Sequence, residues 1–106
     1  MDHQDKTAEA GYWISRASAA VRAHELAQNE HGEAAAVAIA KYAHEQLGGM
    51  LRDPGDTPFP SYALLAETLI HLTAWFNGVD GSEDTANRLD EIASGAALEE
   101  ALEKGA

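Results

Sequence analysis

The side chains in this sequence best suited to chemistry are histidines that stand close to a glutamate. The tripeptide Ala-His-Glu occurs twice, around His24 and around His44, and Glu67 precedes His71 by four residues. Imidazole and carboxylate groups together can bind a metal ion or exchange a proton near neutral pH. These four residues are therefore the candidate polar or ligand-binding residues.

The two Ala-His-Glu tripeptides do not combine into one site within a helical hairpin. Consecutive helix residues point in different directions, so each tripeptide offers one inward ligand at most. If the chain folds back near residues 30–31, His24 and His44 are about seven residues out of register, or ~10 Å along the helix axis. Zn–N bonds are only ~2 Å long, so the two imidazoles cannot share an ion there. A site between two subunits stays open, but we expect His24 to be a buried or half-buried histidine with one hydrogen bond, and His44 to lie at the edge of the core.

Glu67 and His71 do share one helical face, because residues four apart are neighbours on a helix. They could form a pH-sensitive pair or supply two ligands to a metal, or simply face solvent. The sequence names no third ligand for them. We therefore predict no metal site and no cofactor.

The composition excludes several kinds of catalytic centre. Cysteine is absent, which rules out a disulfide framework, a thiolate nucleophile and a zinc–thiolate site. No Gly-rich phosphate-binding loop, Gly-x-Ser-x-Gly motif or Glu-x-x-His motif of di-iron bundles occurs. We therefore expect a non-enzymatic protein. No apolar run approaches the ~18 residues of a membrane span, and the first residues are polar, so we expect a cytoplasmic protein that does not bind membranes.

The charge argues against direct contact with nucleic acid. Eighteen acidic residues oppose seven Lys and Arg, giving a formal net charge of −11. The acids are concentrated after Asp80, where the only cations are Arg88 and Lys104. The simplest interpretation is a solvated helix face. The alternative is an acidic surface that binds a basic partner.

The elements that must position these residues are helices. The chain is interrupted at 29–32, at 48–60, where all three prolines lie, and at 77–82. No segment alternates apolar and polar residues in the way that a β-strand requires. We predict one all-α domain over 1–106, a compact bundle of four helices at roughly 7–29, 32–51, 60–77 and 83–104, with a flexible tail at 1–6.

Local signals refine these helices. The Asn-Gly pair at 77–78 is suited to a helix C-terminus. Ser82 followed by two acids is typical of an N-cap, and Ser94-Gly95 should weaken or kink the last helix. Helical spacing places Ser18 and Arg22 on the outer side of the first helix, and turns Ile39 of the second helix inward.

The segment at 60–77 is apolar around most of its circumference. Its tightest stripe consists of Tyr62, Leu65, Leu69, Leu72 and Phe76. Such a helix is usually covered on several sides. We therefore expect it to be central in the bundle, or to present a surface that is buried when the bundle is completed by dimerisation.

These features favour a protein that acts through contact with another protein, most simply as a homodimer. Interface cores favour aromatic and large apolar side chains. The candidate anchors are Tyr12, Trp13, Leu64, Trp75 and Phe76. Two alternatives stay open: an acidic decoy that inhibits a nucleic-acid-binding protein, and a small-molecule or metal-binding bundle that uses the four polar residues named above.

Overall fold

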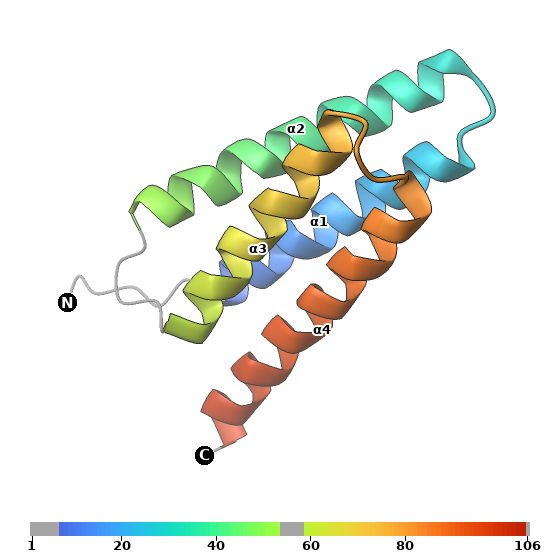
Figure 1. Cartoon of the computed structure of the whole chain (residues 1–106). Helices are drawn as coiled ribbons and strands as arrows, with labels where there is room; N and C mark the ends of the chain where they lie inside the picture. The colour runs from blue at the N-terminus through green and yellow to red at the C-terminus, as the bar shows by residue number, and fades with distance from the viewer. Residues whose placement is uncertain (1–6, 54–58, 106) are drawn as a thin grey trace.

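The chain folds into four α-helices, as its pattern predicts. A computed structural model describes the backbone of residues 7–53 and 59–105, and the side chains of 9–53 and 62–95. The helices are α1 (Thr7–Leu26), α2 (Glu30–Arg52), α3 (Phe59–Phe76) and α4 (Ser82–Gly105) (Figure 1). No strand occurs in the described ranges, and none of their helices is long and apolar enough to cross a membrane. The proposed tail at 1–6 and the middle of the proposed loop, 54–58, lie outside the described residues.

Helix α1, rather than α3, is the central helix. It contacts α2 on one side and α4 on the other, while α3 packs across all three (Figure 1). Within the described residues α2 and α4 do not touch. Small buried side chains on α1, including Ala10, Ala17 and Ala20, let two helices approach it closely. The central position, one of the two alternatives given for the third helix, is thus taken by α1, whose alanines permit closer approach, although α3 also contacts the other three helices.

Helix α3 buries a single stripe and leaves its far side open. Its buried residues are Leu65, Thr68, Leu72 and Trp75, whereas Ile70 is 66% exposed. Thr68 can be buried because its hydroxyl donates to the carbonyl of Leu64, one turn earlier, at 2.8 Å. The buried stripe is thus rotated away from the predicted one, and Leu69 and Phe76 are only half-buried.

The break between α1 and α2 falls earlier than predicted. Asn29 is in extended backbone, and its side chain accepts the N–H of Gly32 at 2.8 Å. This makes Asn29 the N-cap of α2 rather than the last residue of α1. Helix α2 then continues through Gly48 and Gly49 to Arg52, within one residue of its predicted end at 51, so the interruption placed at 48–60 starts too early. Burial of Met50 in this last turn offsets the low helix propensity of the two glycines.

Helix α3 ends where the Asn-Gly pair predicts. Gly78 adopts a positive φ of 76°. Its N–H donates to the carbonyl of Trp75 at 3.0 Å, and the N–H of Val79 donates to the carbonyl of Ala74 at 2.9 Å. These two bonds form a Schellman motif, which satisfies carbonyls at the end of the helix and reverses the chain into α4.

Helix α4 begins differently from the prediction. The carbonyl of Gly81 accepts the N–H of Thr85 at 3.0 Å, so Gly81 occupies the capping position. Ser82 lies one residue further, inside the helix, and its hydroxyl is used elsewhere. The backbone remains helical through Ser94 and Gly95, so the predicted weak point does not end α4.

Candidate functional site

A small polar cluster joins three helices at one end of the bundle. Nδ1 of His24, near the end of α1, lies 3.1 Å from Oγ of Ser82 in α4. The indole N–H of Trp75, from α3, donates to the same oxygen at 2.9 Å. The imidazole and indole rings meet edge to face, with centroids 5.2 Å apart. One hydroxyl therefore fixes the orientation of both rings.

A hollow of about 310 Å³ opens beside this cluster. We call it the His24 hollow; its lining residues are His24, Val37, Lys41, Trp75 and Phe76. Lys41 is exposed and forms no ion pair within the described part of the chain. No carboxylate lines the hollow. It therefore combines apolar and aromatic walls with one positive charge that no carboxylate of the lining neutralises.

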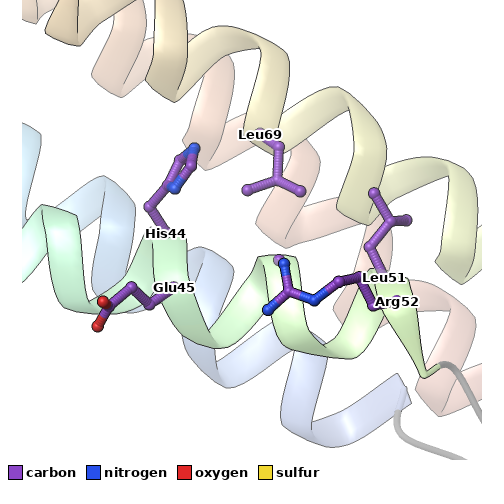
Figure 2. A pocket seen from close by; sticks show the side chains of 6 residues that line it. His44, Glu45, Leu51, Arg52 and Leu69 are labelled. Carbon is purple, nitrogen blue, oxygen red and sulfur yellow. The ribbon is translucent and has the colours of Figure 1, made fainter.

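His44, the second candidate histidine, lies between α2 and α3. Its Nε2 lies 3.3 Å from the hydroxyl of Thr73, and its ring contacts Phe76 edge to face at 5.7 Å. It borders a larger groove of about 580 Å³ (Figure 2), lined by His44, Glu45, Gly48, Leu51, Arg52 and Leu69. Figure 2 shows His44 reaching from α2 toward α3 while Glu45 points away from the gap. His44 thus links α2 to α3, and Glu45 takes no part in this link.

Glu67 and His71 lie at the edge between α3 and α4. Nε2 of His71 is 3.8 Å from Oε1 of Glu67, and the side chains are 19% and 54% exposed. Both line a shallow hollow of about 230 Å³ with Arg88 and Glu91 of α4. The pair therefore sits in a crevice of mixed charge rather than on an open polar face. In the described ranges, no three His, Asp or Glu side chains gather closely enough to hold a metal ion.

An exposed cluster of aromatic rings covers one side of the α1–α2 hairpin. Trp13 meets Tyr12 edge to face at 5.0 Å and Tyr42 at 5.3 Å. Tyr12 is 56% exposed and Tyr42 is 54% exposed. We call this surface the aromatic face; it surrounds a hollow of about 370 Å³ lined by Tyr12, Trp13, Arg16, Ala38, Ile39 and Tyr42. No carboxylate lines this hollow either.

The five candidate interaction residues are divided by the structure. Tyr12 and Trp13 belong to the aromatic face. Trp75 is only 9% exposed and packs within the chain, while Leu64 and Phe76 are half-buried against the core. Sequence reasoning missed two members of the aromatic face. Tyr42 carried no signal beyond being aromatic, and Ile39, which we expected inside, is 42% exposed because it lies at the edge of the inward stripe of α2.

A charged network fastens α4 to α1. Buried Ser18 donates to the carboxylate of Asp90 and is also 3.3 Å from the carbonyl of Ala86. Arg22 donates to the other oxygen of Asp90 at 2.7 Å and to Asn87 at 3.1 Å. The bond from Ser18, then the bond and charge of Arg22, lower the pKa of Asp90 against the opposing effect of desolvation. The predicted outer side of α1 is therefore covered by α4, and this carboxylate is already engaged.

No protein-family model, curated protein or solved structure matches this chain. Its function is therefore argued from its own surfaces. Three of the hollows have no carboxylate in their lining: those of the aromatic face and of His24, and a hollow of about 400 Å³ on α3 lined by Leu69, Ile70, Thr73, Ala74 and Asn77.

Proposed function

We propose that this is a cytoplasmic, non-enzymatic protein that acts through protein–protein contact, and that its partner is a second copy of itself bound at the aromatic face. The observation that carries the proposal is the exposure of three large side chains around Trp13: Tyr12, Ile39 and Tyr42. Aromatic residues of this kind supply much of the binding energy at protein interfaces.

The distribution of charge supports a second copy as the partner. Two chains with a net charge of −11 repel each other wherever their acidic surfaces meet. The segments 10–24 and 34–44, which supply the aromatic face, contain no acidic residue. Contact through the hollow of this face brings no lining carboxylates together, and exposed Glu9 and Glu45 lie about one helical turn from Tyr12 and Tyr42, at its edge. Charges further than ~8 Å from the contact are largely screened at physiological salt. The face is thus a surface on which self-association meets little charge repulsion, and it is the one that carries exposed aromatic rings.

The shape of the hairpin also supports helix packing there. Ala19 and Ala23 follow Arg16 along the exposed side of α1, and Ala35 and Ala38 accompany Tyr42 on α2. Because residues three or four apart share a helical face, these small side chains form continuous strips. They allow the backbones of a partner to approach closely between the aromatic anchors.

Sedimentation equilibrium at tens of micromolar tests the proposal. We expect a dimer whose affinity rises with salt, because salt screens the repulsion between acidic chains. Tyr42→Ser should weaken association at least about tenfold, which is the size of effect expected when an aromatic anchor of an interface is removed. Ile70→Ser is the control, since Ile70 is also a large exposed apolar residue but lies on α3.

Two results would contradict the proposal. A strict monomer at these concentrations removes self-association altogether. A dimer that Ile70→Ser disrupts and Tyr42→Ser does not would move the interface to α3. Salt also separates this proposal from the acidic decoy, because binding of a basic partner to the carboxylates should weaken as salt rises.

A further inference from the structure

We infer that the His24 hollow is a binding site for a small aromatic carboxylate. The hollow lies where α1, α2 and α3 meet, and its volume of about 310 Å³ suits a ligand of one or two fused rings. This site is separate from the aromatic face, so the inference does not depend on self-association.

The walls of the hollow suit a flat apolar ring. Trp75 and Phe76 lie side by side with ring centroids 5.3 Å apart and planes tilted by 48°. His24 stands edge-on to Trp75, and Val37 closes the side formed by α2. Aromatic rings prefer such offset and edge-to-face partners. A planar ligand therefore finds ring contacts from α3 and an aliphatic contact from α2.

The polar groups of the hollow suit an anion. Exposed Lys41 supplies a positive charge to the lining, which has no carboxylate to neutralise it. Nδ1 of His24 is occupied by Ser82, so Nε2 is the ring nitrogen left for a ligand. A carboxylate placed between Lys41 and His24 would receive a donor from each. The net charge of −11 repels anions from most of the protein surface. An anionic ligand therefore has to contact Lys41 directly to be held.

Ser82 prepares His24 for this contact. Its oxygen already accepts the indole N–H of Trp75, so its own proton is available for Nδ1 of His24. In the tautomer in which Nδ1 accepts this proton, the imidazole carries its hydrogen on Nε2, where it can donate to the carboxylate. The same bonds hold both rings in place before a ligand arrives, which reduces the entropy lost on binding.

Titration with 2-naphthoate, followed by ¹H–¹⁵N NMR of the tryptophan side chains, tests the inference. The chain has two tryptophans, and Trp13 lies on the aromatic face, outside the hollow. We expect the indole N–H signal of Trp75 to shift saturably while that of Trp13 stays in place. The neutral amide, 2-naphthamide, has nearly the same shape and should bind about two- to fivefold more weakly, the effect of one exposed ion pair.

Substitutions assign the charge to Lys41. Lys41→Gln should weaken naphthoate binding about fivefold and leave naphthamide binding unchanged, while Lys41→Arg should retain most of the affinity for naphthoate. Arg16→Gln is the matched control, because it removes a cation of the aromatic face and leaves the hollow intact. Circular dichroism confirms that each variant remains helical.

Three outcomes would overturn the inference. One is equal binding of the acid and the amide, which would show an apolar crevice without selection for charge. Another is a shift of Trp13 in place of Trp75, which would put the ligand on the aromatic face. The third is the absence of a saturable shift at millimolar naphthoate.

Discussion

Replacing Ser82 by alanine tests the polar cluster that joins α1, α3 and α4. The change removes the acceptor of the Trp75 indole N–H and the partner of His24 Nδ1 together. Trp75 is only 9% exposed, so its N–H gains little access to water. A net loss of about 1 kcal/mol for each hydrogen bond, with a further penalty for the stranded donor, gives about 2–3 kcal/mol. For a domain of this size, this corresponds to a fall in Tm of about 10 °C or more.

Urea unfolding followed by circular dichroism measures the effect. Ser94→Ala is the matched control, because Ser94 lies on the same helix and is exposed. A double-mutant cycle with Trp75→Phe isolates the indole bond: once the N–H is gone, Ser82→Ala should cost at least about 1 kcal/mol less. If Ser82→Ala unfolds at the same urea concentration as Ser94→Ala, the cluster contributes nothing and the reasoning fails.

Three further changes probe other parts of the bundle. Asp90→Asn should lower the free energy of unfolding by about 1 kcal/mol, a modest value because the side chains of Arg22 and Asp90 are 36% and 55% exposed. Folding lowers the pKa of Asp90, so the stabilisation that its carboxylate provides is full above the ordinary pKa of 3.8 and is lost as the pH falls below it. Urea titrations of the wild type and Asp90→Asn should therefore differ at neutral pH and converge in acid. A difference that stays constant with pH would contradict this. Gly78→Ala should destabilise the protein by about 1 kcal/mol, because Gly78 has a φ of 76°. Gly95→Ala should stabilise it by a similar amount, because Gly95 lies within a helix and has open space around it. A change in Tm of the same sign for both variants would refute these two roles. Thr85→Val should stabilise by about 1 kcal/mol, because the Thr85 hydroxyl is buried without a hydrogen-bond partner in the described part of the chain; a lower Tm would show that the hydroxyl is satisfied.

The helices and their order could be predicted because their ends are marked by local chemistry. The Asn-Gly pair at 77–78 ends α3 through backbone bonds that depend on a few neighbouring residues. Asn29 was assigned to the wrong helix, because an asparagine can either end one helix or cap the next. Its bond to Gly32 decided the matter.

The position of each helix in the bundle was harder to predict. Apolar content suggested α3 for the centre, but the closeness of approach that small side chains permit put α1 there. Periodicity gives the direction of an apolar stripe and says nothing about how many neighbours a helix has. For the same reason Tyr42 and Ile39, which lie beside Trp13 across the hairpin, could not be grouped with it before the two helices were placed.

Serine hydroxyls make the contacts that fix how the helices pack. The sequence pattern predicted that Ser18 faces outward and that Ser82 is an N-cap. Ser18 is buried because Asp90 accepts its proton, and Ser82 lies between His24 and Trp75. In each case a partner far along the chain replaces water, so the hydroxyl can be buried at little cost. No local window of sequence contains both members of such a pair. The candidate polar site therefore became visible only once α1, α3 and α4 were brought together. That dependence also means that any change which separates these three helices should disturb the polar cluster of His24, Trp75 and Ser82 before it disturbs the helices themselves.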